Sequence, residues 1–235
     1  MKQYRTLLFD VDNTLLDFSA AEREALSSLF EEQELALTPE IGQRYMEINQ
    51  GLWKSFEEGK IGRDKVVNTR FSLLFREYGK EVDGVFLEKR YRSYLDKGHQ
   101  LMEGAIEVVE TLQNKYDLYI VTNGVAATQD KRLRASGLYP YFKDIFVSEA
   151  VGCQKPMKQY FDFVFARIDQ FSLEETLIIG DTFNSDIKGG HLAGIDTCWF
   201  NPEQKPNHTD IVPTYEIQTL RDLINILNGD SPPAH

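Results

Sequence analysis

The chain has 235 residues and a formal net charge of −11 at pH 7, so it is long enough to bury a hydrophobic core, with or without an inserted second domain. The excess of acidic residues argues against a nucleic acid polymer as the partner, because binding a phosphate backbone requires positive charge. No apolar run approaches the roughly 20 residues of a membrane span, so the composition predicts no contact with a membrane.

The first predicted element is an apolar strand at about 4–10. The few residues before it leave no room for a signal peptide. The two cysteines, Cys153 and Cys198, give no disulfide framework and are expected to be reduced thiols. These features together predict a cytoplasmic protein.

Two acids, Asp10 and Asp12, stand at the end of this strand. Alternation along an extended chain points them to the same side. Two acids aimed at one point repel each other unless a cation lies between them or one keeps its proton. Both arrangements suit an enzyme in which one acid attacks phosphorus and the other gives and takes a proton. The alternative is that the two acids only end the strand and cap the next segment.

The stretch at about 17–98 has apolar residues at helical spacing and almost no strand character. It is too long for a simple crossover between neighbouring strands. We therefore predict an inserted all-helical domain at 17–98, built from about four helices, and a core domain formed by 1–16 and 99–235.

Strands and helices alternate through the rest of the chain. The predicted strands lie at about 117–122, 145–148, 176–181 and 196–200, and the predicted helices at about 104–115, 126–136, 157–169, 184–193 and 218–228. This alternation predicts an α/β fold with a Rossmann-like parallel sheet flanked by helices. The tail at 229–235 is expected to be disordered.

Polar groups follow three of these later segments. Thr122 and Asn123 end one strand with groups that can hold phosphate oxygens, Lys155 offers a cation fixed by the proline after it, and Asp181 ends another strand five residues before Asp186. The Thr122-Asn123 pair is a weak signal alone. Lys155 is also a weak signal alone, because a lone lysine followed by proline is more often solvated. The pair of acids is a stronger signal.

The four segments, in this order, resemble the motifs of the haloacid dehalogenase-like (HAD) hydrolase superfamily, phosphatase branch. The resemblance implies that Asp10 attacks phosphorus to form an aspartyl-phosphate, while Asp12 protonates the leaving oxygen and then deprotonates water. Thr122, Asn123 and Lys155 would hold the phosphoryl group. One departure is Asn13, where many relatives have glycine; asparagine tolerates unusual backbone angles better than most residues.

The resemblance also implies bound Mg²⁺, held by Asp10, the backbone carbonyl of Asp12 and Asp181, with Asp186 at the ion or next to it. Charge independently supports a metal, because four acids in one cleft would repel a phosphomonoester that is itself close to a dianion. Oxygen ligands favour Mg²⁺ over zinc. The four histidines lie far apart in sequence and show no ligand spacing: His99, His191, His208 and His235.

An insertion after the first motif resembles the helical cap of HAD phosphatases, which chooses the substrate. Segments 49–61, 68–71, 186–190 and 196–202 resemble the pyrimidine 5'-nucleotidases of that superfamily. Phe18 or Trp53 could then stack on a base, and Asn49 or Arg70 could read its edge; Trp53 also fits ordinary helix packing.

The predicted activity is Mg²⁺-dependent hydrolysis of a small phosphorylated metabolite, preferably a pyrimidine nucleoside monophosphate, by a monomer or homodimer. The alternatives are a sugar-phosphate or phosphoglycolate phosphatase, a phosphomutase and, in another class, a non-catalytic scaffold. The scaffold is disfavoured because it has no need of the complete motif set.

Overall fold

The computed structural model describes residues 2–229. Of the tail that the sequence predicts to be disordered, 229–235, all residues from 230 onward lie outside the described range. The chain divides after Phe18 and after Gly98 into two compact units. We call residues 19–98 the helical unit and the remainder the α/β unit. In the described part of the chain, no helix combines the length and apolar character needed to cross a membrane.

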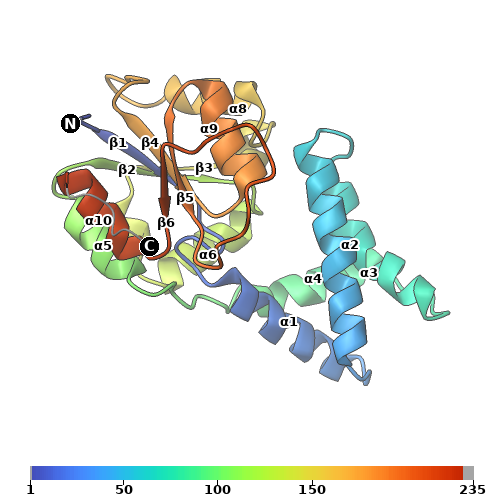
Figure 1. Ribbon diagram of the computed structural model, residues 1–235. Helices are drawn as coiled ribbons and strands as arrows, with labels where there is room; N and C mark the ends of the chain where they lie inside the picture. The colour runs from blue at the N-terminus through green and yellow to red at the C-terminus, as the bar shows by residue number, and fades with distance from the viewer. Residues whose placement is uncertain (1, 230–235) are drawn as a thin grey trace. The chain divides into compact units, whose positions relative to one another are not determined.

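The α/β unit is built on a parallel sheet with the strand order β3-β2-β1-β4-β5-β6 (Figure 1). The strands, as described within residues 2–229, are β1 (Thr6–Phe9), β2 (Asp117–Thr122), β3 (Asp144–Val147), β4 (Thr176–Gly180), β5 (Asp196–Phe200) and β6 (Tyr215–Ile217). The predicted parallel α/β fold is confirmed. The sequence did not predict β6, which has three residues and only one fully buried side chain.

Side chains on alternate strand positions enter two separate cores, one on each face of the sheet. Leu7 and Phe9 of β1 pack in one core, and Leu8 between them packs in the other. The first core includes side chains of α5 (Ala105–Leu112), α6 (Ala126–Ala135) and α10 (Leu220–Asn228), and the second includes those of α8 (Lys158–Phe165). The shorter helical segments are Tyr139–Tyr141, α7 (Ser148–Val151), a π-helical turn at Phe183–Ile187 and α9 (Lys188–Ala193).

The helical unit contains α2 (Pro39–Glu57), α3 (Arg63–Glu77), α4 (Gly84–Leu95) and all of α1 (Phe18–Glu32) after its first residue. Thr38 caps α2 by accepting a hydrogen bond from the Ile41 N–H at 3.3 Å, and Pro39 occupies the first turn, where its missing N–H costs nothing. Asp83 caps α4 in the same way. The predicted helical insertion is therefore present.

Strand order determines where the functional side chains meet. β1 lies between β2 and β4, so the residues that follow these three strands share the carboxyl edge of the sheet. The strands that follow β1 in the chain lie on one side of it up to β3, and on its other side from β4 onward. Open α/β sheets bind ligands at such a reversal of strand order.

Candidate active site

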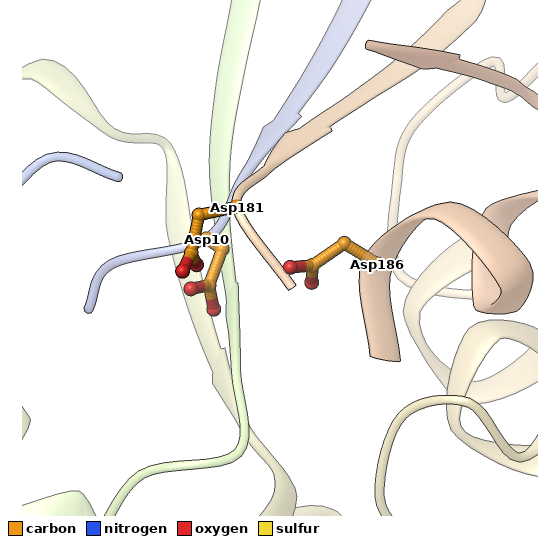
Figure 2. Close-up of side chains that lie close together, drawn as sticks. All are labelled: Asp10, Asp181 and Asp186. Atoms are coloured by element: carbon orange, nitrogen blue, oxygen red, sulfur yellow. The ribbon is translucent and has the colours of Figure 1, made fainter. Parts of the chain in front are cut away.

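Three carboxylates converge at this edge. Asp10 follows β1, Asp181 follows β4 and Asp186 lies in the π-helical turn; each offers an oxygen within 4.8 Å of the others (Figure 2). Asp10 and Asp186 are buried, and Asp181 is half-buried. Within residues 2–229, these three form the one group of acidic, histidine or cysteine side chains arranged closely enough to hold a metal ion.

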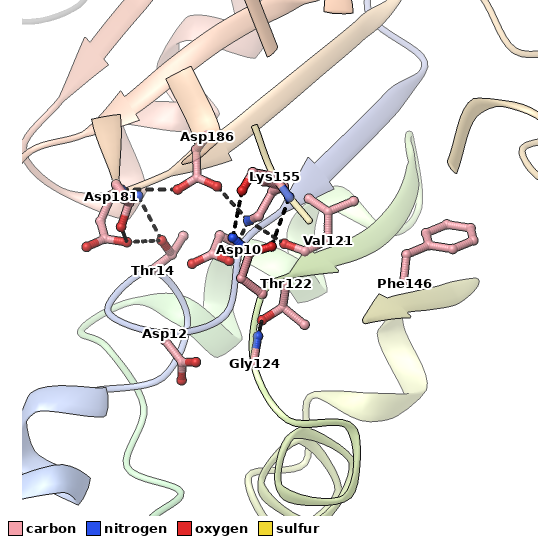
Figure 3. A network of polar contacts seen from close by, with 12 residues as sticks. Asp10, Asp12, Thr14, Val121, Thr122, Gly124, Phe146, Lys155, Asp181 and Asp186 are labelled. Carbon is pink, nitrogen blue, oxygen red and sulfur yellow. Dashed lines mark hydrogen bonds and ion pairs between the residues drawn. The ribbon is translucent and has the colours of Figure 1, made fainter. Parts of the chain in front are cut away.

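Lys155 supplies the positive charge inside this group. Its ammonium donates hydrogen bonds to Asp10 Oδ1 at 2.8 Å, to Asp186 Oδ1 at 2.6 Å and to the Val121 carbonyl at 2.7 Å (Figure 3). An ammonium has three protons, so all of them are used. The side chain is 1% exposed. The lysine is therefore a buried structural cation, and the sequence-based alternative of a solvated lysine is wrong.

Local backbone features make room for this arrangement. A Cβ at Gly180 would lie 2.3 Å from the Asp186 carboxyl group, so glycine is required there. The Thr182 N–H donates to Asp186 Oδ2 at 3.1 Å. Asn13, which replaces a glycine typical of the motif, has φ of 58°, a left-handed conformation that asparagine tolerates. The unusual residue at position 13 thus keeps the turn that a glycine would allow.

Burial and mutual repulsion raise the pKa values of Asp10 and Asp181. Burial raises the pKa of Asp10 well above its usual range; Lys155 opposes this, and the carboxylates of Asp186 and Asp181 add to it. Burial, followed by the charge of Asp186, raises the pKa of Asp181 to about 7. The pKa of Lys155 is raised, because the two nearby carboxylates outweigh the lowering effect of burial. One lysine does not compensate the cluster, and an added cation would fit it.

The side chain of Asn123 holds the main chain of Lys155 in place. Its side-chain amide donates to the Lys155 carbonyl at 2.9 Å and accepts from the Lys155 N–H at 3.0 Å. Both ends of the amide are thus engaged with Lys155. The predicted contact of Asn123 with phosphate would have to come from its backbone N–H.

Asp12 lies apart from the three-carboxylate group (Figure 3). Its two oxygens accept hydrogen bonds from Arg132 and, at 2.7 Å, from Gln129, both in α6. Gln129 also donates to the Thr122 hydroxyl at 3.0 Å. The sequence analysis missed Gln129 and Arg132. The available signal was weak, because both stand in a charged helical stretch that reads as a solvated face.

Thr14 is a second residue that the sequence analysis missed. Its hydroxyl accepts a hydrogen bond from the Asp181 N–H at 3.1 Å and lies 3.4 Å from Asp181 Oδ1. It is fully buried. Thr14 therefore joins the turn after β1 to the turn after β4.

The predicted specificity residues occupy three different environments. Arg70 and Asn49 are buried inside the helical unit, where Arg70 pairs with Glu88 at 2.5 Å and Asn49 donates to Glu22 at 3.0 Å. Trp53 is half-buried in α2, edge-on to a neighbouring phenylalanine. These contacts favour a packing role for Arg70 and Asn49.

Phe18 belongs to the α/β unit. Its half-buried ring lies 5.5 Å from the Arg132 guanidinium carbon, in a cation–π arrangement. The ring therefore contacts the arginine that holds Asp12.

The sheet is parallel and doubly wound, and acids follow its central strands. This arrangement is that of an α/β enzyme whose active site lies at the topological switch point, where the strand order reverses. A family model described as haloacid dehalogenase-like hydrolase matches residues 4–194. The chain therefore belongs to the haloacid dehalogenase-like hydrolases, and the resemblance based on four motifs is confirmed.

Two relatives are similar along almost the whole chain. HAD-hydrolase YfnB of Bacillus subtilis is 63% identical over 228 residues, covering 97% of each chain. Pyrimidine 5'-nucleotidase PynA of Streptococcus pneumoniae is 46% identical over 226 residues, covering 96% of this chain and 95% of PynA. A crystal structure of YfnB bound to magnesium matches with a TM-score of 0.94 and 62% identity, covering 97% of this chain and 100% of that one.

The buried position of Lys155 gives a stability prediction. Lys155→Met removes the cation between two buried carboxylates and should lower the free energy of unfolding by about 3–5 kcal/mol. The loss should shrink as the pH falls, because Asp10, whose pKa is already raised, takes up a proton and no longer needs a compensating cation. Urea denaturation at several pH values measures both effects.

Lys158→Met is the matched control, because Lys158 makes an exposed pair with Asp162, and such pairs contribute little. Equal losses in the two variants would contradict the assigned role of Lys155.

Proposed function

We propose that this hydrolase is a Mg²⁺-dependent phosphatase that acts through an aspartyl-phosphate on Asp10. The observation that carries the proposal is the position of Asp10, with one oxygen on the Lys155 ammonium and two further acids within reach, at the switch point of the sheet. A nucleophilic carboxylate needs positive charge around it when it meets an anionic phosphoryl group.

The donor set fits Mg²⁺. Asp10, Asp181 and Asp186 offer oxygen atoms alone, which suits a hard divalent cation that keeps waters in its shell. The Asp12 backbone carbonyl would add a further oxygen ligand. When bound, Mg²⁺ would offset the negative charge of the carboxylates and of the phosphoryl group. The magnesium-bound structure of YfnB, 62% identical to this chain, supports the assignment.

The residues of the chain divide the reaction into two displacements. An Asp10 oxygen forms a bond to phosphorus as the ester P–O bond breaks, and Asp12 gives its proton to the leaving oxygen. The oxygen of a water molecule then forms a bond to phosphorus as the Asp10 O–P bond breaks, and Asp12 takes a proton from that water. Inorganic phosphate leaves and the Asp10 carboxylate is restored. The Thr122 hydroxyl holds a phosphoryl oxygen throughout, and the positive charge of Lys155 offsets part of the negative charge of the phosphoryl group.

The proposed substrate is a pyrimidine nucleoside 5'-monophosphate. The support is the similarity to PynA, named a pyrimidine 5'-nucleotidase, along 96% of the chain. Trp53 and Phe18 remain the candidates for stacking on the base, because both rings are half-buried. Arg70 and Asn49 are engaged inside the helical unit, and we assign them no contact with the base.

The first prediction concerns the two acids after β1. Asp10→Asn should lower turnover by several orders of magnitude, because the nucleophile is lost while the fold is kept. Asp12→Asn should spare the first step with p-nitrophenyl phosphate, whose leaving group needs little proton donation, more than the first step with a nucleotide. Rapid-mixing assays with both substrates measure this; retention of more than a few per cent of turnover by folded Asp10→Asn would refute the mechanism.

The second prediction concerns the metal. EDTA should abolish turnover, Mg²⁺ should restore it, and Ca²⁺ should inhibit, because its larger and more flexible shell disturbs the line of attack. Asp181→Ala should raise the Mg²⁺ concentration needed for half-maximal activity. Phosphate release titrated against each metal gives the result, and full activity in excess EDTA is the outcome that would remove the metal from the proposal.

The third prediction concerns the leaving group. A stacked base contributes about 1–3 kcal/mol, so UMP, dUMP or dTMP should exceed ribose 5-phosphate and phosphoglycolate in kcat/KM by at least about tenfold. Trp53→Ala should reduce this preference without abolishing hydrolysis of p-nitrophenyl phosphate. Phosphate release across the panel is the measurement. Equal rates would leave a phosphatase but discard the nucleotidase, and a phosphomutase would release no free phosphate.

A further inference from the structure

Two buried polar side chains of α6 connect groups that the mechanism uses separately. Gln129 is 1% exposed and Arg132 is 0% exposed. They stand three residues apart and so share one face of the helix. Both side chains donate hydrogen bonds to site residues: Gln129 donates to Asp12 and to Thr122, and Arg132 donates to Asp12.

Gln129 determines which way the Thr122 hydroxyl donates. The Thr122 oxygen accepts one hydrogen bond from Gln129 Nε2 at 3.0 Å and another from the Gly124 N–H at 3.1 Å. A hydroxyl has two acceptor positions and one proton. With both acceptor positions filled, the proton is directed elsewhere, which suits donation to a phosphoryl oxygen.

The orientation of the Gln129 amide is fixed by its neighbours. Its Oε1 accepts from Arg132 Nη1 at 3.2 Å, so Nε2 is the end that faces Asp12 and Thr122. A Cβ at Gly124 would lie 2.5 Å from Gln129 Nε2. The glycine after Asn123 therefore lets the amide lie directly against the turn.

The Asp12 carboxylate is held at both oxygens. Oδ1 accepts from Arg132 and Oδ2 accepts from Gln129, which fixes the rotation of the carboxylate plane. Arg132 in turn lies against the Phe18 ring at 5.5 Å. An acid that transfers protons to and from a reacting oxygen depends on such placement, because proton transfer requires hydrogen-bond distance.

We propose that Gln129 and Arg132 are positioning residues that join the proton-transferring acid Asp12 to the phosphoryl-binding Thr122. Gln129 contacts both residues directly, whereas Arg132 contacts Asp12 directly and reaches Thr122 only through Gln129. The inference rests on the proposed phosphatase function, and the contacts that carry it all lie within the α/β unit.

The two roles can be separated with Gln129→Leu and Arg132→Met, studied in the full-length protein with Mg²⁺. Arg134→Met is the matched control, since Arg134 lies in the same helix, is 55% exposed and pairs with Asp130. The readouts are turnover of UMP, the burst of p-nitrophenol from p-nitrophenyl phosphate, and inhibition by inorganic phosphate. Thermal unfolding checks that each variant is folded, and Arg132→Lys provides a conservative second variant.

Arg132→Met should lower UMP turnover by about tenfold or more, because Asp12 is no longer placed for proton transfer. The variant should retain the p-nitrophenol burst, because p-nitrophenolate leaves without a proton and only the attack of water is slowed. Arg132→Lys should recover part of the turnover. Gln129→Leu should also slow turnover and should raise the inhibition constant of inorganic phosphate by about threefold to tenfold, as expected for a hydrogen bond whose donor is no longer oriented. Arg132→Met should raise that constant less than Gln129→Leu does, because Arg132 reaches Thr122 only through Gln129, and Arg134→Met should resemble the parent protein in all readouts.

Turnover and burst lowered equally in Arg132→Met and Arg132→Lys would overturn the role of Arg132, because a structural defect reduces both. An unchanged phosphate inhibition constant in Gln129→Leu would overturn its role toward Thr122. If the parent protein itself released no phosphate from either substrate, the proposed function would fail, and this inference with it.

Discussion

The placement of the site depends on an electrostatic constraint at the carboxyl edge of the sheet. Strand order brings acids from β1, β4 and the following turn to one point, and buried carboxylates repel each other strongly. The Lys155 ammonium, bonded to Asp10 and Asp186 and to a carbonyl of β2, offsets part of this charge. The negative charge that it leaves uncompensated would attract a divalent cation, and that cation would offset the repulsion between the carboxylates and an anionic substrate.

The helical unit has a separate buried ionic network. Arg70 pairs with Glu88, which also pairs with Arg92, and the network continues through Asn49 to Glu22. Removing one member would leave a buried charge without its partner. Polar residues at helical positions can therefore be structural even in a domain expected to contact substrate. The resemblance to nucleotidases suggested base contacts for Asn49 and Arg70, but it carries no information on which side chains they meet inside the helical unit.

The sequence predicted features that depend on local pattern. Apolar runs ending in acids located β1 and β4. The sequence did not predict the partners of Asp12, because Arg132 lies 120 residues away along the chain, in a helix whose other charged residues include the exposed Asp130 and Arg134. Long-range pairing, rather than local pattern, determines that Arg132 is buried.

The account depends most on Asp10 being the residue that becomes phosphorylated. Rapid acid quenching during turnover of a phosphomonoester, followed by peptide mass spectrometry, tests this directly, because an acyl phosphate survives long enough in acid to be mapped. The account predicts a phosphoryl group on the peptide containing Asp10, which is absent without Mg²⁺ and which hydroxylamine displaces as inorganic phosphate, leaving a hydroxamate at Asp10. A phosphoryl group on another residue, or solvent oxygen incorporated into phosphate with no phosphorylated protein under conditions that slow the water step, would contradict it.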